Sequence, residues 1–194
     1  IYYHLFYGHQ EFYQNMKTLM TIHNIQYQGK YGLEVLTDVL GIPKEATSLV
    51  EYDDCVNLLK GAVECSNWVS TVSPTYAQEI MDPWFSYKLD GILKERSWKL
   101  SGILNGIDTK NYDPETDSDI YSAAHPEGKT VNKQKLQERL GLEQNPDIPL
   151  IGMVTRMVSA KGLDLVIEGL DQIMCSNHVQ FVILGSGDFE YESF

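Results

Sequence analysis

Two cations, Arg156 and Lys161, stand where an apolar run gives way to a helical pattern. The run, residues 150–154, is short and bounded by turn-forming residues, as expected for a buried strand. The helical pattern begins near Gly162. A helix N-terminus offers unpaired N–H groups and partial positive charge, to which Arg and Lys add formal charge. We therefore predict that Arg156 and Lys161 bind a diphosphate, the alternative being that both are solvated loop side chains.

The next apolar run, 179–184, ends in a turn that contains Gly185 and Gly187. A helical pattern over about 163–174 separates the two runs, which predicts a right-handed βαβ unit whose two loops leave the sheet at the same edge. Gly185 and Gly187 would let the backbone approach a nucleotide closely. A Gly-x-Gly pair is a weak signal, and an ordinary turn is the alternative.

A polar loop that begins with His23 and Asn24 follows the predicted strand 16–23. Amide, imidazole and phenol groups suit a sugar, which presents many hydroxyls and a few apolar faces. We interpret the loop as part of a sugar site. For His23 alone, a structural histidine at a strand end is the alternative.

Asn105 follows another predicted strand, 100–104. Ligands of open parallel sheets bind at the carboxyl ends of the strands, so Asn105 is a further candidate for the site. Because Asn-Gly is a common tight-turn pair, a plain turn at Asn105 and Gly106 is the alternative.

The remaining patterns predict an α/β protein built from parts of two domains. We expect helices over 33–40, 57–65, 74–81 and 132–140 and a further strand over 68–72. The polar, turn-rich stretch 111–126 is the best linker candidate, and the proline-containing stretch 143–149 gives a second boundary. We therefore place the domains at 1–146 and 147–194.

Composition excludes several classes of function. The net charge of −12 and the pI of about 4.7 make nucleic acid an unsuitable partner. No apolar run is long enough to span a membrane. The three cysteines, Cys55, Cys65 and Cys175, are widely spaced, which favours a reduced, cytoplasmic compartment without a zinc site.

The chain begins at Ile1 rather than Met, and its last predicted sheet has two strands, so we expect a fragment. Aromatic residues crowd the first 15 positions. These rings and the incomplete sheet would leave apolar surface uncovered, so self-association of the truncated chain is an expected consequence, with disorder at either end as the alternative.

Six segments together resemble the ADP-glucose-dependent starch and glycogen synthase family of bacteria. They occur in order along the chain: TIHNIQYQG (21–29), NLLKGA (57–62), TVSPTYAQEI (71–80), LSGILNGID (100–108), RMVSAKG (156–162) and VILGSGD (182–188). The resemblance implies a glycosyltransferase B fold, with two Rossmann-like domains facing a cleft, both incomplete here. The Lys-x-Gly-Gly loop and the glutamate-bearing segment of the family have no match in this chain.

The family pattern implies a role for each candidate residue. It assigns Arg156 and Lys161 to the ADP phosphates. It places His23 and Asn24 near the glucosyl group and the reacting centre, and Asn105 on the sugar side. The loop of Gly185 and Gly187 would line the nucleotide.

The implied reaction is the transfer of glucose from ADP-glucose to the non-reducing end of an α-1,4-glucan, with retention and without a metal or other cofactor. The isolated fragment is expected to be inactive. Two alternatives remain open: a non-catalytic carbohydrate- or nucleotide-binding module, and a transferase of the same fold that uses UDP-glucose.

Overall fold

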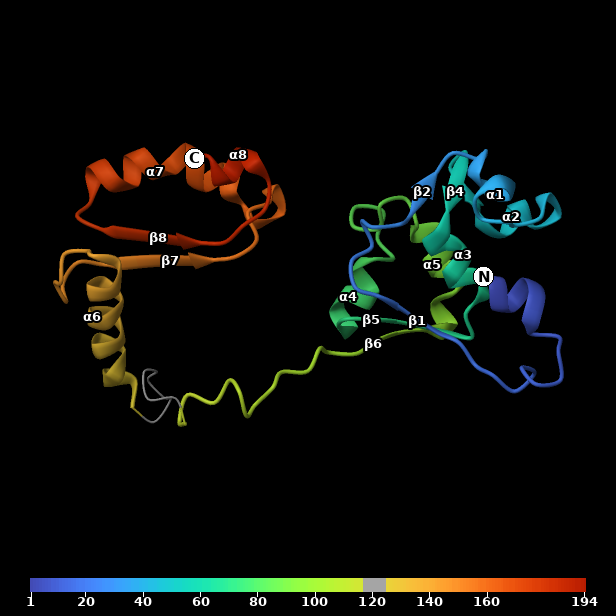
Figure 1. Cartoon of the computed structure of the whole chain (residues 1–194), viewed down its shortest axis with the longest axis horizontal. Coiled ribbons are helices and arrows are strands. Elements are labelled where there is room, and N and C mark those ends of the chain that lie inside the picture. Colours follow the sequence, from blue (N-terminus) through green and yellow to red (C-terminus); the bar gives the residue numbers. More distant parts are fainter. Residues whose placement is uncertain (117–124) are drawn as a thin grey trace. The chain divides into compact units, whose positions relative to one another are not determined.

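The computed structural model describes residues 1–116 and 125–194 (Figure 1). The described chain forms two compact units, Ile1–Ile107 and Asp108–Phe194. The first unit contains two three-stranded sheets, and the second contains one two-stranded sheet with its own core.

The first unit is organised on a parallel sheet in the order β1-β5-β6. Its strands are β1 (Leu19–Ile22), β5 (Trp68–Thr71) and β6 (Leu100–Gly102). The hydroxyls of Thr21 and Ser70 lie 2.8 Å apart and join β1 to β5 through a hydrogen bond. These strands confirm the three that the sequence predicts for this region, although each is shorter than expected.

Three helices accompany this sheet: α3 (Leu58–Cys65), α4 (Pro74–Glu79) and α5 (Asp90–Glu95). Their apolar faces and the strands enclose one core, because apolar side chains recur at helical spacing on α3 and α5. The buried residues of that core are Ile22, Ile25, Leu59, Val63, Val69, Ile80, Leu89 and Leu93.

Side-chain caps fix where α3 and α4 begin. The Asn57 Oδ1 atom accepts the backbone N–H of Lys60 at 2.9 Å. The Ser73 Oγ atom accepts the N–H of Tyr76 at 2.9 Å, and Pro74 occupies the first helical position. Each cap satisfies a backbone donor that the first helical turn leaves unpaired.

A small antiparallel sheet in the order β2-β4-β3 was not predicted from the sequence. It consists of β2 (Lys30–Tyr31), β4 (Cys55–Asn57) and β3 (Glu51–Tyr52). Such short strands carry no readable alternation of apolar and polar residues. Short elements cover a second core here: η1 (Tyr3–Tyr7), α1 (Val35–Asp38), η2 (Lys44–Ala46) and α2 (Thr47–Val50).

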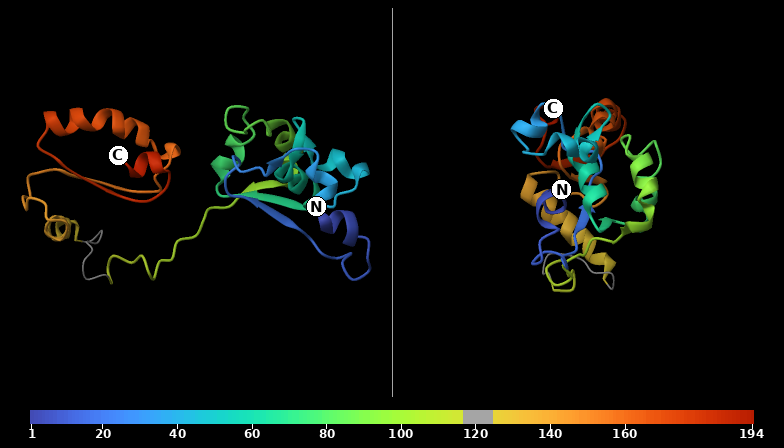
Figure 2. Two further views of the ribbon diagram at one scale, coloured as in Figure 1. Left: turned by 45° about the horizontal axis from the view of Figure 1, so that its top comes forward. Right: turned by 90° about the vertical axis from the view of Figure 1, so that its right-hand side faces the viewer.

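The second unit contains the predicted βαβ arrangement. Strands β7 (Leu150–Val154) and β8 (Gln180–Leu184) are parallel and are connected through α7 (Leu163–Ser176). Figures 1 and 2 show α7 and α8 (Phe189–Glu192) on one side of the strands and α6 (Lys129–Leu140) on the other. Two single-turn helices complete the unit, η4 (Pro126–Gly128) and η5 (Ser159–Lys161).

The division into units differs from the predicted boundary at 146/147, since α6 belongs to the second unit. Gln137 of α6 is 1% exposed, and its Nε2 donates to Gln180 Oε1 at 2.8 Å and to the Asn145 carbonyl at 3.1 Å. Gln180 Nε2 in turn donates to the Glu143 carbonyl at 2.7 Å. The polar stretch 143–149 is therefore bound into the second unit by hydrogen bonds rather than separating two domains.

No helix within 1–116 or 125–194 is long and apolar enough to cross a membrane.

Candidate functional site

The first group of predicted site residues lies at one edge of the β1-β5-β6 sheet. Ile22 pairs with Thr71, and Thr71 pairs with Gly102, in parallel register. The chain therefore leaves β1 and β6 at the same edge, where His23 and Asn105 are both exposed. With β5 between them, the two strands are separated by about 10 Å, twice the usual strand spacing.

The loop that carries His23 and Asn24 is anchored to the rest of the first unit through Ile25. Ile25 is 1% exposed, and its backbone N–H donates to Tyr76 Oη at 3.2 Å. Asn24 Oδ1 accepts the N–H of Gln26 at 2.9 Å, so part of that amide serves the loop itself. The His23 side chain, directly after the end of β1, is exposed.

A buried polar pair that the sequence reading missed supports the end of this loop. Gln28 is 4% exposed; its Nε2 donates to the Tyr87 carbonyl at 3.0 Å, and its Oε1 accepts from Asn57 Nδ2 at 2.7 Å. Asn57 is the N-cap of α3, so the loop is joined to that helix. The signal available in the sequence was the N-cap residue Asn57, whereas the helix predicted over 57–65 includes it as its first residue.

Asn105 does not occupy the tight turn given as its alternative. The stretch 103–108 has no turn, and the Ile103 N–H extends the β6 pairing by donating to the Thr71 carbonyl at 2.8 Å. The turn lies further on, where Asp108 Oδ1 accepts the N–H groups of Lys110 and Asn111 at 3.0 and 3.1 Å. These donors lower the pKa of Asp108.

The second group lies where β7 and β8 end. Arg156 follows β7 directly after Thr155, and Lys161 is the last residue of η5, immediately before Gly162 and α7. Both side chains are exposed, and neither forms an ion pair with any residue in the described part of the chain. Gly162 has φ of +73° and supplies no side-chain cap, so the first N–H groups of α7 are not capped by its N-cap residue. Unpaired cations at an uncapped helix start are a suitable environment for an anion.

Gly185 and Gly187 have a structural reason to be glycine. A Cβ atom on Gly185 would lie 1.9 Å from the Thr155 carbonyl oxygen, and one on Gly187 would lie 2.3 Å from that of Met157. The Met157 N–H donates to the Ser186 carbonyl at 2.8 Å, and Met157 and Gly187 form a parallel bridge. The glycines therefore allow the two loops to pair, whether or not a nucleotide also approaches them.

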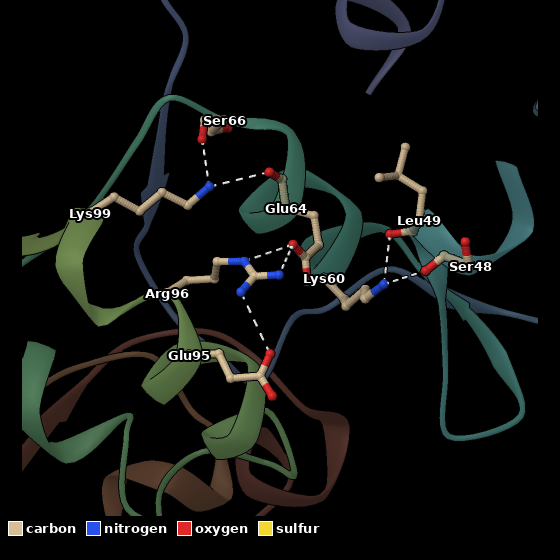
Figure 3. A network of polar contacts seen from close by, with 8 residues as sticks. All are labelled: Ser48, Leu49, Lys60, Glu64, Ser66, Glu95, Arg96 and Lys99. Atoms are coloured by element: carbon tan, nitrogen blue, oxygen red, sulfur yellow. Dashed lines mark hydrogen bonds and ion pairs between the residues drawn. The ribbon is translucent and has the colours of Figure 1, made fainter.

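Buried cations in the first unit serve a different purpose (Figure 3). Lys60 Nζ donates to the carbonyls of Ser48 and Leu49 at 2.5 and 3.0 Å. Lys99, only 3% exposed, donates to the carbonyls of Glu64 and Ser66 at 3.2 and 2.7 Å, and burial lowers its pKa. These lysines neutralise the carbonyl ends of α2 and α3, so they are not available to a ligand.

Several open grooves occur in the described part of the second unit. One of about 510 Å³ adjoins the glycine loop and is lined in part by Met157, Leu163, Gly185 and Tyr191. Another, of about 540 Å³, runs along α6 and contains none of the predicted site residues. Within the described ranges, no three His, Cys, Asp or Glu side chains gather in a way that could hold a metal ion.

Comparisons with known proteins find starch and glycogen synthases. Residues 1–95 match the family model of the starch synthase catalytic domain. A glycogen synthase of Alkaliphilus metalliredigens is 46% identical over 191 residues, which cover 96% of this chain and 40% of that protein. A glycogen synthase of Geobacillus stearothermophilus is 43% identical over 193 residues, which cover 97% of this chain and 40% of that protein.

A solved structure is similar over the whole chain. The catalytic domain of Starch Synthase IV from Arabidopsis thaliana, bound to ADP and acarbose, matches with a TM-score of 0.81 and 33% identity. The match covers 100% of this chain and 41% of that one. The chain thus spans about 40% of the length of the curated relatives it matches. The chain is similar to starch and glycogen synthases along its whole length, and its two units contain parts of the parallel α/β sheets of the glycosyltransferase B fold of the solved starch synthase.

Proposed function

We propose that this chain is the part of a retaining glucosyltransferase that transfers glucose from ADP-glucose to the non-reducing end of an α-1,4-glucan. The observation that carries the proposal is the pair of exposed cations between the end of β7 and the start of α7, Arg156 and Lys161, which form no ion pair with the residues that the structure describes. The similar starch synthase structure was obtained with ADP bound, which supports a diphosphate as the partner of such cations.

The cations would act on the leaving group. Negative charge grows on the distal phosphate of ADP as the bond to glucose breaks. Arg156 and Lys161 are fixed positive charges next to an uncapped helix start, so they would stabilise the transition state more than the ground state. Arg offers a planar, bidentate donor set, whereas Lys contributes a compact point charge.

The first unit would hold the sugar. Exposed His23, with Asn24 and Asn105, offers neutral hydrogen-bonding groups at one sheet edge. Such groups can orient glucose hydroxyls without adding charge next to an oxocarbenium-like centre. The proposal includes no metal and no other cofactor, with ADP-glucose and the glucan as the two substrates.

The test is a donor comparison on the complete protein that contains this chain. With glycogen as acceptor, we expect ADP release from ADP-glucose and elongation of the glucan. Turnover with UDP-glucose alone would contradict the donor assignment. Saturable binding of ADP or glucan without any turnover would instead identify a binding module and overturn the proposed activity.

A further inference from the structure

The carboxylate of Asp164 joins three elements of the second unit. Its Oδ2 atom accepts a hydrogen bond from the Ser159 hydroxyl at 3.0 Å, and its Oδ1 atom accepts one from the Tyr191 hydroxyl at 2.6 Å. Asp164 lies in the first turn of α7, Ser159 begins η5, and Tyr191 belongs to α8. One side chain therefore ties η5 and α8 to the start of α7.

The Tyr191 end of this connection is buried. Tyr191 is 7% exposed and packs in a core cluster with Met157 and Leu163. Hydrogen bonds in which the acceptor is ionised are shorter and stronger than neutral ones, and a bond of 2.6 Å belongs to that class. The hydrogen bond to Asp164 also raises the pKa of Tyr191, so the phenol remains the donor at neutral pH. Asp164, although exposed, is thus held against a buried group.

Ser159, the other partner of Asp164, lies in the same helical turn as Lys161. Ser159, Ala160 and Lys161 form the single turn of η5. The Gly162 N–H donates to the Ser159 carbonyl at 2.9 Å, closing the turn immediately before α7. Short 3₁₀ turns have poorer hydrogen-bond geometry than α-helices, so a side-chain anchor at the first residue matters for the position of the last.

The negative charge of Asp164 is unfavourable for direct binding of a diphosphate. A carboxylate in the first turn of α7 lies close to the place proposed for a diphosphate, where an additional negative charge repels the ligand. Two hydroxyl donors offset part of that charge by hydrogen bonding. A structural role for Asp164, in which it holds the η5 turn that carries Lys161, would account for an acidic residue at this position.

We propose that Asp164 is a positioning residue that, through Ser159 and Tyr191, holds the η5 turn so that Lys161 is presented to the diphosphate of the donor. The inference rests on the proposed function for its ligand. It adds three residues that act through Lys161 and do not themselves touch the substrate.

The first test measures the turn itself, without any ligand. Tyr191→Phe keeps the buried ring and removes only the hydroxyl, and Ser159→Ala removes the other donor. Both variants should increase the hydrogen-exchange rate of the Lys161 and Gly162 amides about 10-fold, by analogy with the loss of one hydrogen bond of about 1.4 kcal/mol. Tyr52→Phe is the matched control, because it removes a tyrosine hydrogen bond of 2.8 Å to the Lys88 carbonyl in the first unit. That control should leave the Lys161 and Gly162 amides unchanged.

The second test separates positioning from general stability. In the complete protein, Tyr191→Phe should lower kcat/KM for ADP-glucose by about 10-fold or more, since a small misplacement of a catalytic group is costly. In the Lys161→Ala background, Tyr191→Phe should have no further effect, because the group it positions is gone. Multiplying effects of the two changes would indicate a merely structural role and would overturn the proposal.

The outcomes are distinguishable from a failure of the proposed function. If the unaltered protein turns over neither nucleotide sugar, the function is contradicted, and the amide exchange rates alone decide whether Asp164 holds the turn. Unchanged exchange in both variants would overturn the proposal whatever the activity. Faster exchange with unaltered kcat/KM would overturn the link between the turn and the donor.

Discussion

Met157 and Ser186 join the two loops of the second unit, since the Met157 N–H donates to the Ser186 carbonyl at 2.8 Å. The Asp188 N–H returns a bond of 2.8 Å to the Met157 carbonyl. Met157 directly follows Arg156, so the backbone of that cation is held by the loop after β8. The two loops form one paired unit at the edge of the sheet.

This pairing predicts that the loop glycines cannot carry a side chain. Gly185→Ala would place a methyl group 1.9 Å from the Thr155 carbonyl oxygen, so we expect it to reduce the free energy of unfolding by about 1–3 kcal/mol. Urea unfolding followed by circular dichroism measures this change. Gly169→Ala is the control in the same unit, because a Cβ atom there would lie 4.0 Å from Ile173 Cδ1, an ordinary contact, and a helical glycine gains roughly 0.5–1 kcal/mol on conversion to alanine. Equal stability of the two variants would contradict the pairing.

A second prediction concerns the loop that carries His23. Tyr76→Phe removes the acceptor of the Ile25 N–H and should cost about 0.5–1.5 kcal/mol locally, because the buried donor loses its partner. The measurement is hydrogen exchange at the Ile25 amide, which should become faster. Tyr52→Phe, which breaks a hydrogen bond elsewhere in the first unit, should leave that amide unaffected. Unchanged exchange in Tyr76→Phe would show that the loop is held by packing alone.

A third prediction concerns the pKa of Asp53. Lys88 Nζ lies 2.7 Å from Asp53 Oδ2, and its hydrogen bond and charge lower the pKa of Asp53 below the ordinary 3.8. A carboxyl group whose pKa is lower in the folded than in the unfolded protein stabilises the folded state at pH values above its unfolded pKa. This stabilisation is lost as the pH falls through the folded pKa. Lys88→Met should therefore raise the pKa of Asp53 in an NMR titration.

Asp108 provides the control for that titration. Its pKa is lowered mainly by the backbone N–H groups of Asn111 and Lys110, which the Lys88 substitution does not touch. Asp108 should titrate identically in both proteins. An unchanged Asp53 titration in Lys88→Met would show that the ion pair does not persist in solution.

The parts of the fold that the sequence predicted are those with a strong local signal. The apolar run before Arg156 and the helical pattern over about 163–174 predicted the βαβ unit, and the helix expected from residue 74 begins there as α4. The small sheet around Asn57 was missed, because strands of two or three residues depend on partners distant in sequence.

In the candidate site, too, the features with a local sequence signal were predicted, and those that depend on residues distant in sequence were missed. The strand ends correctly placed His23 and Asn105 at one edge and Arg156 and Gly185 at another. The predicted boundary near 146 does not coincide with the division between the two compact units, because the buried bond between Gln137 and Gln180 cannot be read from local polarity. The role of Asp164 was also out of reach, since it depends on the distant Tyr191 hydroxyl. The roles of the site residues in catalysis stay predictions.

The chain exposes several large aromatic residues, including Phe12 and Trp84. Self-association of the 194-residue chain therefore stays a prediction, for which light scattering over a concentration series is the measurement. A mass equal to one chain at every concentration would contradict it.

The most direct test of the account is the kinetic effect of removing each exposed cation from the complete protein. Arg156→Ala and Lys161→Ala should each lower kcat with ADP-glucose on the order of 10²–10³-fold, by analogy with the loss of one transition-state donor. Arg139→Ala removes an exposed cation of α6 and should leave kcat unchanged. Unaltered kcat in both Arg156→Ala and Lys161→Ala would show that they are ordinary solvated side chains and would contradict the central claim.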